Sequence, residues 1–199
     1  FMEDGTIVYH VYTTDLRGDY YNYVWRSTDY GDTWNLYPMG SHLLSVLIDE
    51  TAMVEVAPGK LLAHQRVDDG PQYLLERWSD DGGVTWTDPL RTDIWGYPAH
   101  LLKLRDGRIM WLWSTGIHPE LLANYSSDGG QSWSDAVVCK MVDGRDMPSA
   151  GNVSVIRMAC GDLGLVQLTQ LDGGGVAAIR KFSFYRSRDD GESWSEGVP

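Results

Sequence analysis

The segment Ser79-Asp80-Asp81-Gly82-Gly83-Val84-Thr85-Trp86 decides the fold, because its pattern occurs four times in the chain. The other copies are STDYGDTW at 27–34, SSDGGQSW at 126–133 and SRDDGESW at 187–194. All four fit Ser-x-Asp-x-Gly-x-(Ser/Thr)-Trp and recur at intervals of roughly fifty residues, which predicts a repeat architecture.

Each copy has the chemistry of a tight turn. Asp accepts hydrogen bonds from backbone amides two or three residues further on, and Gly adopts a positive φ without a steric clash. The hydroxyl residues satisfy other polar groups of the turn, and Trp returns a large apolar ring to the core. We therefore interpret the repeated aspartates as residues that stabilise the fold, and we look for function elsewhere.

A second repeated signal, a glycine turn, precedes each copy. Gly5, Gly59, Gly107 and Gly161 are separated by 54, 48 and 54 residues. Each is expected to join two strands. Two turns in every unit of about fifty residues predict four antiparallel strands, the blade of a β-propeller in an all-β protein.

The expected strands follow from these turns. In the second unit they cover 51–57, 61–66, 72–78 and 86–91, and in the third unit 100–104, 108–114, 121–126 and 133–140. In the fourth unit they cover 152–158, 164–171 and 176–185, with a short segment at Trp194. The run from Ile109 to Trp113 is apolar throughout, which predicts a strand covered on both faces.

The predicted blades span roughly 1–48, 49–95, 96–146 and 147–199 of one propeller domain. By this count the first blade lacks its inner strand and the last lacks most of its outer strand. Three interpretations follow: part of a larger propeller, with six blades expected, a small four-bladed ring, or two chains that self-associate to cover open blade edges.

Composition excludes several classes of protein. A formal charge of −12 argues against a nucleic-acid binder. No apolar run is long enough for a membrane span, and no signal peptide is visible. Nine Trp and eleven Tyr against three Phe suit strand-rich folds and sugar-binding surfaces. The two cysteines, Cys139 and Cys160, are expected to be buried and unpaired.

The five histidines show no ligand spacing with carboxylates, so we predict neither a metal nor another cofactor.

The repeated turn resembles the Asp box, or bacterial neuraminidase repeat. The blade from Glu50 to Arg66 resembles the sialidase superfamily, in which a blade begins with Glu, passes through a Gly turn and ends its second strand with Arg. Here the interval from Glu50 to Arg66 is sixteen residues. The resemblance implies a sialidase-like β-propeller.

It also implies roles for this pair. Glu50 matches the carboxylate that polarises a nucleophilic Tyr, and Arg66 matches one of three arginines that bind the sugar carboxylate. The strand order supports the pairing, because Glu50 opens one strand and Arg66 closes its antiparallel neighbour. Both then lie at the end of the blade opposite the repeated turns, where Arg can bind a carboxylate in bidentate fashion.

A second alignment stays open. In sialidases the first blade also ends its second strand with Arg, followed by the Asp that acts as acid and base. The sequence Arg66-Val67-Asp68-Asp69 fits that pattern as well. The best catalytic set in this chain is therefore Glu50 with Tyr97 as nucleophile, and Asp68 or Asp69 as proton donor.

Other rim residues are candidates for substrate binding. Trp95 and Tyr97 lie in a connection between blades where they could stack on a sugar ring, and further candidates occupy loops of the same rim: Arg17, His118, Asp15 and Asp172. Two parts of the sialidase pattern are missing. The Arg-Ile-Pro motif is absent, and the loop 114–120, where an Arg is expected, offers only His118 as a cation.

We therefore predict a sialidase-like exo-glycosidase or a fragment of one, acting on terminal sialic-acid-type sugars of glycoconjugates. The alternative is a non-catalytic propeller that binds carbohydrate or a protein partner. Because the constellation is incomplete, we expect the isolated chain to be inactive or very weak.

Overall fold

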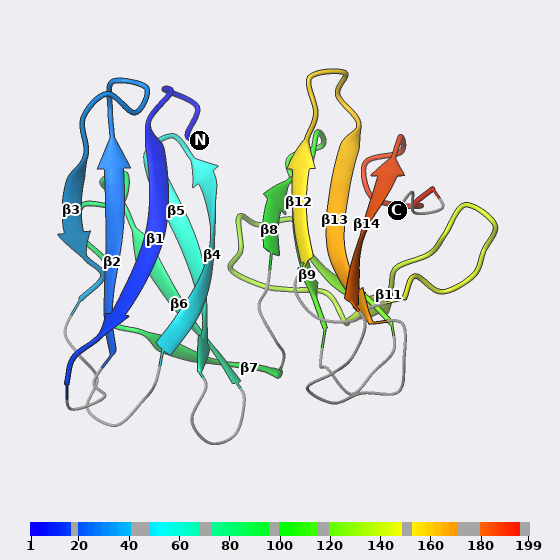
Figure 1. Cartoon of the computed structure of the whole chain (residues 1–199), viewed down its shortest axis with the longest axis horizontal. Helices are drawn as coiled ribbons and strands as arrows, with labels where there is room; N and C mark the ends of the chain where they lie inside the picture. Colours follow the sequence, from blue (N-terminus) through cyan, green and yellow to red (C-terminus); the bar gives the residue numbers. More distant parts are fainter. Residues whose placement is uncertain are drawn as a thin grey trace. The chain divides into compact units, whose positions relative to one another are not determined.

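A computed structural model describes residues 1–16, 20–40, 48–67, 73–95, 100–114, 120–148, 153–170 and 180–195. These residues form two compact units, 1–95 and 96–199. Figure 1 shows that the regular structure of both consists of β-strands. The described residues include no helix long and apolar enough to cross a membrane.

The first unit contains two antiparallel sheets, which we call sheets A and B (Figure 1). Sheet A contains β1 (Ile7–Thr14), β2 (Tyr20–Ser27) and β3 (Asn35–Pro38). Sheet B contains β4 (Ile48–Ala57), β5 (Lys60–Val67), β6 (Tyr73–Ser79) and β7 (Leu90–Trp95).

The second unit also contains two antiparallel sheets, C and D. Sheet C contains β8 (His100–Lys103), β9 (Ile109–Trp113), β10 (Leu122–Ser126) and β11 (Val137–Val138). Sheet D contains β12 (Val153–Arg157), β13 (Leu163–Gln170) and β14 (Arg180–Ser187). The prediction of four-stranded units is confirmed for sheets B and C, and sheets A and D have three strands, as the repeat count predicts.

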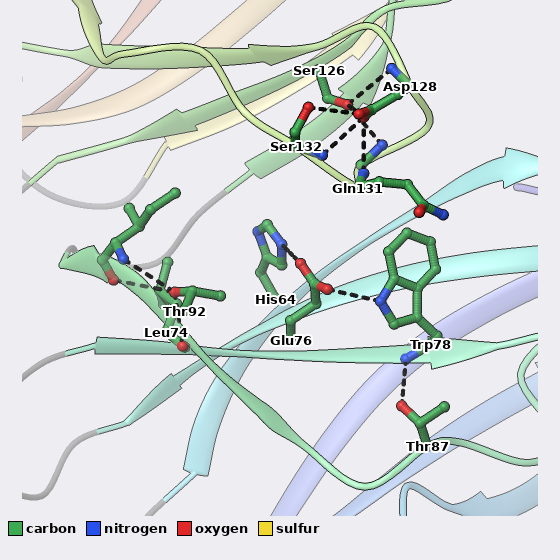
Figure 2. Close-up of polar contacts among 12 residues, drawn as sticks. His64, Leu74, Glu76, Trp78, Thr87, Thr92, Ser126, Asp128, Gln131 and Ser132 are labelled. Carbon is green, nitrogen blue, oxygen red and sulfur yellow. Dashed lines mark hydrogen bonds and ion pairs between the residues drawn. The ribbon is translucent and has the colours of Figure 1, made fainter.

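The repeated turns hold their shape through the Asp carboxylate. Asp128 accepts hydrogen bonds from Ser126 Oγ at 2.8 Å, from Ser132 N at 2.9 Å and from Ser132 Oγ at 2.6 Å (Figure 2). Ser126 Oγ in turn accepts the Gly130 amide at 2.7 Å. The same bonds recur around the other three aspartates of the repeat: Asp29, Asp81 and Asp189. These hydrogen bonds support the prediction that the four aspartates stabilise the fold.

The backbone of each turn is left-handed at two successive positions. The repeated glycine has a positive φ, as predicted, and so does the residue before it, with φ of 74° at Gly129 and 70° at Gly82. In the other two copies that residue is Tyr30, with φ of 58°, or Asp190, with φ of 61°. A non-glycine residue rarely adopts this conformation, so the hydrogen-bonded carboxylate holds the chain in it.

The outer strands begin later than predicted. β7 starts at Leu90 instead of Trp86, and β11 is confined to Val137–Val138. The cause is a hydroxyl residue directly after the repeated Trp. The Thr87 amide donates to Trp78 O, but the Trp78 amide donates to the Thr87 side-chain hydroxyl, at 3.0 Å, and not to a backbone carbonyl. Ser134 and Tyr125 form the same pair of hydrogen bonds. The side chain replaces the backbone carbonyl, so the regular ladder is interrupted.

Sheets pack face to face within each unit. Val24 of sheet A packs with Ala63 of sheet B, and in the second unit Leu112 of sheet C belongs to one core with Leu165 of sheet D. All residues of β9 are buried, which confirms the prediction that both its faces are covered. The repeated Trp is not always in the core, because Trp194 is fully buried but Trp34 is exposed.

The cysteine prediction is half right. Both cysteines are free, and Cys139 is buried, which raises the pKa of its thiol to about 12. Cys160 is exposed, so the expectation that it is buried is wrong. It directly precedes Gly161 in the turn between β12 and β13, where the chain reverses at the surface.

The repeated turns should make stability depend on acidic pH. Hydrogen bonds from Thr33 and from Ser132 lower the pKa of Asp29 and Asp128 to about 2. The folded pKa is below the unfolded value of about 3.9, so the stabilisation is full above that pH and is lost as the pH falls towards 2. We expect an Asp29→Asn, Asp128→Asn double variant to melt about 5 °C lower at pH 7 and to lose less Tm than the parent between pH 4 and 2.

Thermal melts by circular dichroism across pH 2–7 would measure this. The exposed Asp135 lies outside the turns, so Asp135→Asn serves as the control and should follow the parent curve. Parallel curves for the double variant and the parent would contradict the proposed role of the two carboxylates.

Candidate functional site

Glu50 and Arg66 form an ion pair at one end of sheet B. Arg66 Nη1 donates to Glu50 Oε2 at 2.7 Å, and the side chains are 17% and 31% exposed for Arg66 and Glu50. Glu50 lies near the start of β4 and Arg66 near the end of β5. The two side chains thus meet at the end of the sheet opposite the repeated turn at 79–86, as the strand order predicts.

A β-bulge aims Glu50 at Arg66. Ile48 pairs with Val67 and Thr51 with Gln65, so two residues of β4, 49 and 50, stand against the single Arg66 of β5. Thr51 and Gln65 lie on one face of the sheet, since the Gln65 amide donates to Thr51 Oγ1 at 3.2 Å. Bulges of this kind redirect a side chain and are common beside active sites.

The face of β5 that carries Gln65, opposite to the face that carries Arg66, is held by a buried polar network. Arg77 Nε donates to Gln65 Oε1 at 2.7 Å, and Arg77 Nη1 donates to Thr87 O at 2.9 Å. Gln65 and Arg77 are both buried. A buried polar group that loses its hydrogen-bond partner destabilises the folded state, so this network holds in place the strand that carries Arg66.

A second network continues on the Arg66 face of β5. His64 Nε2 lies 3.3 Å from Glu76 Oε2, and Trp78 Nε1 donates to Glu76 Oε1 at 2.8 Å (Figure 2). Burial lowers the pKa of His64. Burial disfavours the ionised form of Glu76, but the hydrogen bonds from His64 and Trp78 outweigh it and lower the Glu76 pKa. At neutral pH, therefore, a neutral His64 donates Nε2–H to the Glu76 carboxylate.

Sheet A supports the start of β4. Asn22 Nδ2 donates to Ile48 O at 3.1 Å, and Asn22 Oδ1 lies 2.7 Å from His10 Nε2. Burial lowers the pKa of His10, so at neutral pH this imidazole is neutral and donates to the amide oxygen. The contact fixes the backbone next to the bulge that carries Glu50.

Among the described residues, no other predicted site residue lies at the Glu50–Arg66 pair. Trp95 ends β7, and its side chain is outside the described set. Asp15 is described and accepts a hydrogen bond from Tyr21 at 3.3 Å. The other predicted residues lie wholly outside the described ranges: Arg17, Asp68, Asp69, Tyr97, His118 and Asp172.

Sequence reasoning missed the supporting residues. His64, Gln65, Glu76 and Arg77 are polar residues within strands whose other members are mostly apolar, and that contrast was a usable signal. The described residues contain no group of three or more His, Cys, Asp or Glu side chains placed to hold a metal ion.

The family model described as a BNR repeat-like domain matches residues 1–147. No curated protein matches the chain. Among solved structures, the NanB sialidase from Streptococcus pneumoniae aligns with a TM-score of 0.70 and 12% identity, over 99% of this chain and 50% of its own. A Hadza microbial sialidase aligns with a TM-score of 0.66 and 20% identity, over 99% of this chain and 45% of its own.

The α-L-arabinofuranosidase from Fusarium graminearum aligns almost as well, with a TM-score of 0.69 and 14% identity, over 96% of this chain and 59% of its own. At these identities the similarity establishes the fold, which is that of the sialidase-type β-propellers. The chain spans about half the length of these proteins.

A double-mutant cycle would measure the coupling of Glu50 and Arg66. Both side chains are largely shielded from water, so we expect Glu50→Gln and Arg66→Met to be non-additive by about 1 kcal/mol in the free energy of unfolding. Urea denaturation of the parent, the two single variants and the double variant gives this value. Additive losses would mean that the contact is not formed in solution.

Proposed function

The chain belongs to the BNR repeat-like domain family, and we propose that it is a sialidase-like glycoside hydrolase, or a fragment of one, acting on terminal sialic-acid-type sugars. The observation that carries the proposal is the ion pair of Glu50 and Arg66 at the end of sheet B. It places a carboxylate and a guanidinium side by side, away from the turns that stabilise the fold.

The two side chains suit an anionic sugar. A guanidinium binds a carboxylate through two parallel hydrogen bonds, and a sialic acid carries such a carboxylate. The substrate carboxylate would compete with Glu50 for Arg66. Once displaced, Glu50 would be available to accept a proton from a phenol, which is the role that a carboxylate has beside a Tyr nucleophile.

The other proposed participants come from the sequence. Tyr97 is the proposed nucleophile, and Asp68 or Asp69 is the proposed proton donor to the leaving oxygen. Trp95, His118 and Arg17 are proposed to contact the substrate. These assignments rest on the resemblance and on the positions of these residues in the sequence.

A non-catalytic propeller is the second candidate. The sequence 114–120 offers His118 where a sialidase has Arg, so the group of cations that binds the sugar carboxylate is incomplete in this sequence. The similarity to an arabinofuranosidase also means that the fold does not select the substrate. Binding of carbohydrate, or of a protein partner, without hydrolysis is the function that would remain.

A fluorogenic sialoside assay separates the two candidates. We expect weak turnover that Glu50→Gln lowers by about 10²-fold or more, because a general base would be lost. Arg66→Lys should raise KM, because Lys cannot form two parallel bonds to a carboxylate. A fluorogenic arabinofuranoside, which has no carboxylate, is the control substrate. Any turnover of it should be the same for the parent and for Arg66→Lys.

Asp143→Asn is the control variant, since it removes an exposed carboxylate that forms an ion pair with the nearby Arg145 side chain. It should leave turnover unchanged. If the parent shows no turnover but binds sialic acid by saturation-transfer NMR, the non-catalytic candidate is correct. Turnover that Glu50→Gln leaves untouched would exclude the assigned catalytic role.

A further inference from the structure

Tyr12 of β1 occupies the position in sheet A that Arg66 of β5 occupies in sheet B. In each sheet the first Ser of the repeated turn pairs with the residue five positions before it in the strand, which is Ile7 before Tyr12 and Leu61 before Arg66. A propeller repeats its sheets radially, so equivalent positions of successive sheets lie at the same end. Tyr12 therefore lies at the end of the unit that carries the candidate site, away from the repeated turns.

The Tyr12 side chain is on the face of sheet A that is turned towards sheet B. Tyr12 pairs with Asn22, and residues directly opposite each other share one face of a sheet. Asn22 Nδ2 donates to Ile48 O of β4 at 3.1 Å, so this shared face meets the start of β4. Figure 1 shows that β1 ends and β4 begins at the same end of the unit. Tyr12 is therefore beside the segment of β4 that carries Glu50.

The Tyr12 ring is supported from within the unit and open to water. It stacks on the His10 ring, with centroids 6.2 Å apart and planes inclined by 23°. His10 is itself held by Asn22, whose Oδ1 lies 2.7 Å from His10 Nε2. Tyr12 is nevertheless 47% exposed, although it is on the face turned towards sheet B. A flat ring that is fixed in orientation and partly open to water suits contact with the C–H groups of a sugar.

Sheet B separates the Tyr12 ring from the Arg66 guanidinium. Gln65 points towards sheet A, since its amide contacts the sulfur of Met39, the residue after β3, at 3.9 Å. Arg66 alternates with Gln65 and therefore points to the other face of sheet B. Facing sheets lie about 10 Å apart, so a ligand that contacts both side chains at the end of sheet B must be longer than one sugar ring. Its charged group would bind Arg66, and its uncharged part would contact Tyr12.

We propose that Tyr12 is a substrate-binding residue that determines which acidic sugars the site accepts. Its ring contacts the uncharged chain of a sugar acid whose carboxylate binds Arg66. This inference rests on the proposed function, because it takes Arg66 as the carboxylate-binding group. It adds a criterion of length: a sialic acid, with a three-carbon polyol chain on its ring, reaches Tyr12, whereas glucuronic acid, a hexose acid without such a chain, does not.

NMR titration of the whole 199-residue chain with sialic acid and with glucuronic acid tests the proposal. The parent should bind sialic acid more tightly. Tyr12→Ala should raise the Kd for sialic acid about fivefold and change the Kd for glucuronic acid by less than about twofold, because only sialic acid loses a contact. Tyr12→Phe keeps the ring and should bind both acids as the parent does. Arg66→Lys should weaken the binding of both acids.

Tyr9→Ala is the matched control, since Tyr9 lies on β1 with its side chain on the opposite face and is 62% exposed. It should leave both Kd values unchanged, and circular dichroism checks that each variant is folded. If Tyr12→Ala weakens neither acid, or weakens both equally, while Arg66→Lys weakens both, the role of Tyr12 is overturned and that of Arg66 is kept. If the parent binds neither acid, or if Arg66→Lys has no effect, the proposed function is overturned and the role of Tyr12 with it.

Discussion

The carboxylate of the repeated Asp is the interaction on which the rest of the structure depends. In each copy it accepts a side-chain hydroxyl, a backbone amide and a second hydroxyl, and so holds two successive residues at positive φ. A turn of that shape reverses the chain and returns the Trp to the sheet. Because four turns of one geometry recur along the chain, four similar sheets form, and the Asp side chains are fully used in building them.

Much of this fold could be predicted from the sequence, because the turn chemistry is local. The spacing of Gly5, Gly59, Gly107 and Gly161 places the strand pairs, and all four have positive φ. The outer strands were less predictable. Their start depends on whether Thr87 or Ser134 bonds through its side chain or its backbone, and residue pattern alone does not decide that. Exposure of Cys160 and Trp34 likewise depends on which surfaces pack together.

The candidate site was predictable in part for the same reason. Antiparallel pairing brings the start of β4 to the end of β5, so the meeting of Glu50 and Arg66 follows from the strand order. The bulge that aims Glu50 and the buried partners of Gln65 and Arg77 are tertiary features, and strand periodicity does not reveal them. The sequence shows Glu50 and Arg66 only as two residues sixteen positions apart. The structure shows that they form a partly buried ion pair.

We propose that ligand binding occurs at the Glu50–Arg66 end of sheet B and not at the repeated turns. Amide chemical-shift mapping by NMR, with sialic acid added to the isotope-labelled chain, tests it most directly. We expect the chemical-shift changes to concentrate at Glu50, Thr51 and Arg66, and the amide signals of Gly31, Gly83, Gly130 and Gly191 to stay unchanged. Shifts centred on those four glycines, with none at Glu50 or Arg66, would contradict it.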